Sequence, residues 1–195
     1  MLAWLSPRGP INYLVIESIS DARMLGLKMK QYAFDHEGRY PTGESSTEVF
    51  QHLMDQGYLT PNEASEILYI YGMPGKTRYR GTGPLQPENV CFDVIVSVDL
   101  GDNDWLPIVM STGWKIPEFA EGVAPTVLDP AQAKTIDRYN TGWFEEAVPS
   151  LAFAREGGAA EFAKEHGPKH DGRLEQFFPP GIDFAPGKTY RQLRP

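Results

Sequence analysis

The segment from Ile11 to Glu37, INYLVIESISDARMLGLKMKQYAFDHE, decides the fold of this chain. Apolar residues recur in it with the 3.6-residue period of an α-helix. Gly38 follows at the position of a left-handed helix cap, and Pro41 prevents the helix from resuming. The sequence therefore predicts one long helix over residues 11–37.

This helix has two apolar stripes rather than one. The first suits packing on the core of the chain, and it consists of Val15, Ile19, Ala22, Leu25, Met29, Tyr32 and Ala33. The second lies nearly opposite, and it consists of Ile16, Met24, Leu27 and Phe34. Polar strips separate the two, with Glu17, Asp21, Lys28 and Asp35 on one side and Arg23 and Lys30 on the other. Either loops of the same chain cover the second stripe or a second molecule does.

Two shorter helices are expected over residues 45–66. Ser45 and Glu48 have the spacing of a capping box, which marks the start of the first of them. Thr60, followed by proline and then Glu63, repeats the start signal for the second. That second helix has room for one or two turns, because the next residues are expected to form a strand.

From residue 68 onward the pattern favours strands. Leu68–Tyr71 is predicted to be a short one. Residues 91–98 and 105–112 are rich in β-branched and aromatic side chains, and a polar turn joins them, so they should pair as an antiparallel hairpin. Pro107 within the second run indicates an edge strand or a bulge.

Residues 151–155 and 159–164 are predicted to form another hairpin, with a helix from Ala159 to Glu165 as the alternative. Residues 113–149 and 165–195 are rich in Pro and Gly, and we expect them to wrap the surface as extended chain. Helices first and strands afterwards predict an α+β fold, in which the long helix packs on a small antiparallel sheet within one domain of 1–195.

The composition limits the classes of function. The chain has 195 residues and a formal charge of −8, which disfavours nucleic acid as a partner. The lone cysteine, Cys91, excludes an intrachain disulfide and a thiolate-rich metal site, and its place in an apolar run favours a core role. No segment has the ~20 apolar residues that a membrane-spanning helix needs.

One loop has the chemistry of a calcium site. Asp99, Asp102 and Asp104 place hard oxygen ligands close together, although the spacing is not that of an EF-hand. A solvated hairpin tip explains the same residues without an ion. Apart from this possible calcium site, the sequence predicts no cofactor.

Two other groups of residues suggest competing functions. A hydrolase or metal-dependent enzyme would use His166, His170 and Asp171, but Gly167 and Pro168 make a helix between the histidines improbable. A binding groove for a ligand or peptide would be lined by loop aromatics, namely Trp114, Phe119, Tyr139, Trp143 and Phe144. The same rings could instead pack the loops onto the sheet. No other pattern assembles a catalytic site, so we expect a protein that is not an enzyme.

The long helix and its exit resemble those of prepilin-like proteins, including the type II secretion pseudopilins. The matching positions at the helix exit are Tyr32, Ala33, Asp35, Gly38, Tyr40 and Pro41. The following helix and its exit are also similar, at Phe50, Leu53, Gly57, Tyr58 and Leu59. The resemblance is good from Ser20 to Leu59, weak to Phe162 and absent beyond.

The resemblance implies a pilin-like fold and a structural subunit of a pilus-like or pseudopilus filament. Ile16, Met24, Leu27 and Phe34 would then face a neighbouring pilin-like subunit, and the domain would face the periplasm. Some family members bind calcium in a strand-connecting loop. The family's leader and apolar first helix half are not found in this sequence, so anchoring in the inner membrane would depend on a segment missing from it. The alternative is an exported ligand- or peptide-binding module on the same scaffold.

Overall fold

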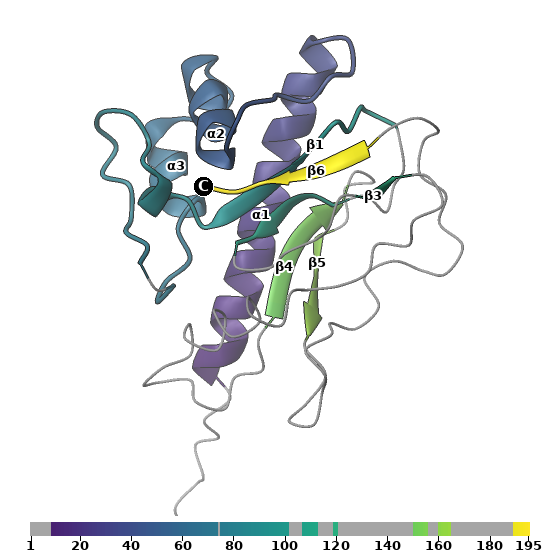
Figure 1. Ribbon diagram of the computed structural model, residues 1–195. Helices are drawn as coiled ribbons and strands as arrows, with labels where there is room; N and C mark the ends of the chain where they lie inside the picture. The colour runs from purple at the N-terminus through teal and green to yellow at the C-terminus, as the bar shows by residue number, and fades with distance from the viewer. Residues whose placement is uncertain are drawn as a thin grey trace, which may run out of the picture.

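The computed structural model describes residues 9–73, 75–101, 107–112, 119–120, 150–155, 160–164 and 189–195. Three helices come first and are followed by a 3₁₀ turn: α1 (Gly9–Asp35), α2 (Ser46–Asp55), α3 (Pro61–Ile67) and η1 (Pro87–Asn89). The strands come next: β1 (Phe92–Val96), β2 (Pro107–Ser111), β3 (Phe119–Ala120), β4 (Ser150–Arg155), β5 (Ala160–Lys164) and β6 (Thr189–Leu193). The expected α+β class is confirmed (Figure 1).

Gly38 caps the C-terminal end of helix α1, as the sequence predicts. Gly38 has a φ of +81°, and its backbone N–H donates to the carbonyl of Ala33 at 2.8 Å, which closes the last turn. A side chain at this φ would be strained, so glycine is needed here. The helix differs by two residues at each end from the predicted range of 11–37.

The caps of α2 and α3 also follow the sequence, with one difference. Thr60 and Glu63 form the full reciprocal capping box at the start of α3. At α2 the Ser45 hydroxyl accepts from the N–H of Glu48 at 3.2 Å, but the Glu48 carboxylate accepts from the N–H of Glu44 instead of returning to Ser45. Only half of the predicted capping box therefore forms at α2.

The prediction of a strand at Leu68–Tyr71 is wrong. This segment leaves α3 and enters a turn at Tyr71, without a place in the sheet. Leu68 and Ile70 are buried, and the Leu68 carbonyl accepts from the N–H of Cys91 at 2.8 Å. The apolar residues that suggested a strand pack on the core instead.

Both predicted hairpins are confirmed. In the first, β1 and β2 pair antiparallel, with Phe92 opposite Ser111. In the second, β4 and β5 pair antiparallel, which excludes the alternative helix. The register shifts between Pro107 and Val109, so the proline marks a bulge. Strand β2 lies between β1 and β4, so the edge-strand alternative is wrong.

The last strand is the main departure from the sequence-based expectation. The chain end was expected to wrap the surface, but β6 lies inside the sheet, whose described strands have the order β3-β6-β1-β2-β4-β5. Tyr190 and Leu193 are buried, and the Arg194 carbonyl accepts from the N–H of Ser46 at 3.0 Å. The end of the chain thus joins the sheet to the start of α2.

Helix α1 runs along the sheet and contacts β2, β4 and β5, while α2 and α3 lie beside it (Figure 1). Every residue of β1 and β2 is buried. Among the described helices, none combines the length and apolar character needed to cross a bilayer.

Candidate assembly interface

The first stripe of α1 packs on the core, as predicted. Of its members with described side chains, the fully buried ones are Ala22, Leu25, Met29 and Ala33, and the partly buried ones are Ile19 and Tyr32. The side chain of Val15 is outside the described part. The core therefore fixes the rotation of α1 about its own axis.

The second stripe faces outward. Met24, Leu27 and Phe34 are 42%, 48% and 70% exposed. The side chain of Ile16, the fourth predicted member, lies outside the described part of the structure. We call Met24, Leu27 and Phe34 the exposed stripe. The sequence left open whether loops of the same chain or a second molecule cover this stripe. None of the described residues covers it.

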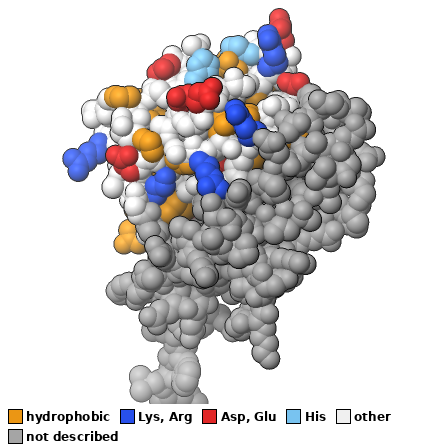
Figure 2. Space-filling view, in the orientation of Figure 1, with side chains coloured by type: hydrophobic (Ala, Val, Ile, Leu, Met, Phe, Trp, Pro, Cys, Tyr) orange, Lys and Arg blue, Asp and Glu red, His pale blue; other side chains and the backbone are white. Residues whose placement is uncertain are grey.

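Large exposed apolar side chains are otherwise uncommon in the described regions. Outside α1, Tyr71 is the one residue of this kind among them. On the face that carries α2 and α3, apolar side chains are scattered among charged ones (Figure 2). Apolar residues scattered singly are ordinary on a protein surface, whereas a set aligned on one helix face marks a candidate interface.

An ion pair holds one flank of α1. The Lys28 ammonium donates to a Glu63 carboxylate oxygen of α3 at 2.6 Å. This bond, together with the bond from the Thr60 backbone N–H, lowers the pKa of Glu63 to about 2. On the same flank, burial and then the charge of Glu17 raise the pKa of Asp21 to about 7, against the effect of Arg78.

A cluster of rings holds the C-terminal end of α1. Tyr32 stacks on His36 with ring centroids 3.8 Å apart, and His52 Nε2 lies 3.1 Å from the Tyr32 hydroxyl. The Tyr58 hydroxyl donates to Asp35 at 2.9 Å, and this bond raises the pKa of Tyr58. The sequence analysis missed this cluster, although the spacing of Tyr32 and His36 on one helix face was a usable signal. It keeps the end of the exposed stripe in a fixed position relative to α2.

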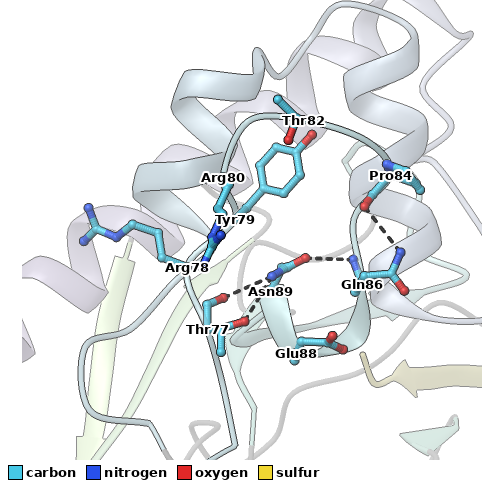
Figure 3. A pocket seen from close by; sticks show the side chains of 9 residues that line it. All are labelled: Thr77, Arg78, Tyr79, Arg80, Thr82, Pro84, Gln86, Glu88 and Asn89. Carbon is cyan, nitrogen blue, oxygen red and sulfur yellow. Dashed lines mark hydrogen bonds between the residues drawn. The ribbon is translucent and has the colours of Figure 1, made fainter.

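A hollow of about 560 Å³ lies inside the loop formed by residues 77–89 (Figure 3). Asn89 closes the loop, because its amide nitrogen donates to the Thr77 carbonyl at 3.2 Å and its amide oxygen accepts from the Gln86 N–H at 3.0 Å. The Arg78 side chain points away from the hollow in Figure 3, and its guanidinium lies over the ring of Tyr69. The lining mixes apolar and polar groups and does not indicate one class of ligand.

The predicted calcium site is only partly within the described residues. Asp99 is described, and its backbone bridges to Arg39. Asp102 and Asp104 lie outside, so the calcium prediction stays a prediction. The described part of the chain contains no group of three or more His, Cys, Asp or Glu side chains arranged to hold a metal.

The residues that suggested other functions are placed as follows. His166, His170 and Asp171 are outside the described residues, as are Trp114, Tyr139, Trp143 and Phe144. Phe119 lies in β3, but its side chain is not described. Cys91 is fully buried, and burial raises the pKa of its thiol to about 11, so a core role is confirmed and a reactive thiolate is excluded at neutral pH.

No family model, curated protein or solved structure matches this chain. The resemblance to prepilin-like proteins therefore stays a prediction from the sequence. The structure establishes the α+β class, and the feature with a distinct chemical character is the exposed stripe of α1.

Proposed function

We propose that this protein is a structural subunit of a pilus-like or type II secretion pseudopilus filament. It acts by assembling with other pilin-like subunits rather than by catalysis. In such a filament, subunits anchored in the bacterial inner membrane are added at the base, and their periplasmic domains pack around the bundled helices.

One observation carries this proposal. The same helix is buried along one stripe and exposes Met24, Leu27 and Phe34 along another. A helix that serves only its own core needs one apolar stripe. A helix that also packs on a neighbour needs two, so the exposed stripe is the surface expected of an assembly subunit.

The energetics favour assembly that depends on anchoring. Full burial of a Met, Leu or Phe side chain contributes about 1.5–3 kcal/mol, and these three are already partly buried. Association costs at least about 4 kcal/mol in lost freedom of motion. The stripe alone therefore supports only weak pairing in solution, whereas anchoring in one membrane raises the effective concentration enough to permit assembly.

The test is the double substitution Met24→Asp and Leu27→Asp in cells that produce the protein from its own gene. Both positions are exposed, so the variant should fold with nearly unchanged circular dichroism and melting temperature. Filaments seen by electron microscopy, and secretion of the cargo, should be lost. Tyr71→Asp is the control, because Tyr71 is also a large exposed apolar residue, 65% exposed, but is not on α1. Normal filaments made from the double variant would refute the proposal.

A further inference from the structure

The carboxyl group of Asp93 is enclosed between two strands of the sheet. Asp93 lies in β1 and is fully buried. Gln192 of β6 stands opposite Ile95, which makes it a diagonal neighbour of Asp93 on the same face, and its side-chain amide donates to Asp93 Oδ2. Thr112, just after β2, donates its backbone N–H to Cys91 and also hydrogen-bonds to the Asp93 carboxyl. The carboxyl group is therefore held from both flanking strands.

This enclosure suits a neutral carboxyl better than an ionised one. Asp93 Oδ1 has no hydrogen-bond partner among the described residues. Because an ionised carboxylate can accept about four hydrogen bonds, burial with one oxygen unpaired disfavours the charged form. Burial raises the pKa of Asp93 to about 6, against the opposing effects of Thr112, Gln192, Arg194 and Lys76. Ionisation near neutral pH therefore destabilises the closed arrangement.

Other titratable groups lie close enough to affect Asp93 or to titrate with it. Lys76 and Arg194 supply the positive charges that act on it. The thiol of Cys91, two residues earlier, has a pKa raised by burial to about 11, so it stays neutral. Asp21 of α1 acts on Cys91, and burial raises the pKa of Asp21 to about 7. Asp21 and Asp93 thus titrate in overlapping ranges, and an experiment has to separate them.

Strand β6 is the less firmly held of the two strands that flank Asp93. Among the described elements, β2 is paired with β4 on its far side and is also packed against α1. Strand β6 pairs with β1 through residues 191–193, and on its far side it pairs with the two residues of β3 (Figure 1). Tyr190 and Leu193 are buried, which keeps β6 closed in most molecules. Movement of β6 away from β1 is therefore the least costly way for water to reach the Asp93 carboxyl.

We propose that Asp93 is a pH-dependent latch for the C-terminal strand: β6 stays closed on β1 while the Asp93 carboxyl is protonated, and ionisation promotes a local opening of β6 that leaves the rest of the fold intact. Opening hydrates the carboxylate and breaks its bond with Gln192. It also frees the backbone N–H and C=O groups of β1 on that side, which are then available for pairing with another strand. This device does not depend on the filament role.

Amide hydrogen exchange, followed residue by residue by NMR on the full chain, tests the latch. After correction for the intrinsic pH dependence of exchange, protection of the β6 amides that bond to β1 should fall about tenfold from pH 5 to pH 8. This is the factor for a carboxyl whose pKa is about 6 in the closed state and 3.8 in the open state. The Ser46 amide should change in parallel, because it donates to the Arg194 carbonyl at 3.0 Å and opening breaks this bond.

Low concentrations of urea distinguish local opening from global unfolding. A local opening exposes little surface, so protection of the β6 amides should hardly change with urea. The amide of Leu25, in the buried stripe of α1, should lose protection steeply, because it exchanges through global unfolding.

Two substitutions separate the carboxyl groups, and a third provides a second test of Asp93. Asp93→Asn removes the titrating group and should reduce the change in β6 protection to less than about twofold. Asp21→Asn is the matched control and should keep the tenfold change. Gln192→Ala removes a hydrogen bond that favours the ionised form of Asp93, so the pKa of the closed state rises and the change should exceed tenfold.

Equal protection of β6 at pH 5 and pH 8 would overturn the latch, and so would an unchanged pH dependence in Asp93→Asn. Loss of the effect in Asp21→Asn would assign it to Asp21 instead. If the β6 amides followed Leu25 in urea, or if Ser46 did not follow β6, the opening would not be that of the C-terminal strand. A change of tenfold or less in Gln192→Ala would refute the contact between Gln192 and Asp93 as part of the latch.

Discussion

The two apolar stripes of α1 contain the same kinds of side chain in opposite surroundings. Leu25 and Met29 are fully buried. Met24, next to Leu25 in the chain, and Leu27, two positions from both buried residues, are about half exposed. The four residues share one helix, the same backbone geometry and nearly the same helix propensity. Any difference between their substitutions must therefore come from the packing of each face. One face stabilises the fold, and the other is available for contacts between molecules.

The largest predicted effect compares matched leucines. Leu25→Ala should lower the free energy of unfolding by about 2–5 kcal/mol, because it removes buried methyl groups and leaves a cavity. Leu27→Ala should change it by no more than about 0.5 kcal/mol. Urea denaturation of both variants measures the difference. Equal losses would mean that the two faces do not differ as the structure indicates.

A second prediction extends the comparison to carboxylates. Asp93 lies in β1 and is fully buried, with the Gln192 side-chain amide donating to it, whereas Asp35 is exposed at the end of α1. Burial raises the pKa of Asp93 to about 6, against the lowering effect of hydrogen bonds from Thr112 and Gln192. Asp93→Asn should therefore raise stability at pH 8 by about 1–3 kcal/mol, since it removes a buried charge. Asp35→Asn should have little effect, and chemical denaturation at pH 8 compares the two.

The pH dependence of the unaltered protein follows from the same carboxyl groups. Asp93 and Asp21 have folded-state pKa values of about 6 and about 7, both above the ordinary value of 3.8. Between the ordinary pKa and the raised folded-state pKa of each group, the folded state binds more protons than the unfolded state. The free energy of unfolding should therefore fall as pH rises from about 4 to about 7. Melting temperatures measured across this range test the sign. The slope should be smaller in Asp93→Asn, and an unchanged slope would remove Asp93 as its source.

The smallest effects are expected where α3 holds the flank of α1. Thr60→Ala removes the N-cap of α3 and should cost about 1 kcal/mol. Glu63→Gln should cost less than about 1 kcal/mol at neutral pH, because the Lys28 pair is partly exposed to solvent. The folded-state pKa of Glu63, about 2, lies below its ordinary value of 4.5, so this contribution is lost as pH falls from about 4.5 toward 2. Thermal denaturation of both variants at pH 7 and pH 3 distinguishes the contribution of the Thr60 N-cap from that of the Lys28–Glu63 ion pair.

Local signals in the sequence were sufficient for much of the fold. The Gly38 cap of α1, the capping box of Thr60 and Glu63, and both hairpins follow from residues close together in the chain. The exposed stripe could also be predicted, since helical period alone separates Met24, Leu27 and Phe34 from the core-facing residues. The calcium prediction is still untested, because two of its three residues are not described.

Longer-range features could not be predicted in this way. Leu68–Tyr71 looked like a strand because a short apolar run has the same composition whether it pairs in a sheet or packs as irregular chain. The position of β6 beside β1 depends on a partner almost one hundred residues earlier, and nothing within residues 189–193 specifies it. The ring cluster of Tyr32, His36, His52 and Tyr58 forms only because α1 and α2 come together.

The amino-acid sequence by itself determined where helices start and stop to within two residues, which strands form hairpins and which residues lie on each face of α1, because these depend on neighbours within a few positions. The tertiary structure decided that the chain end completes the sheet, that Asp93 is enclosed in it, and that the described residues leave the second face of α1 uncovered. Burial is a property of the whole assembly of elements. Two leucines with equal local preferences can therefore differ in environment only after the sheet has packed against one side of the helix.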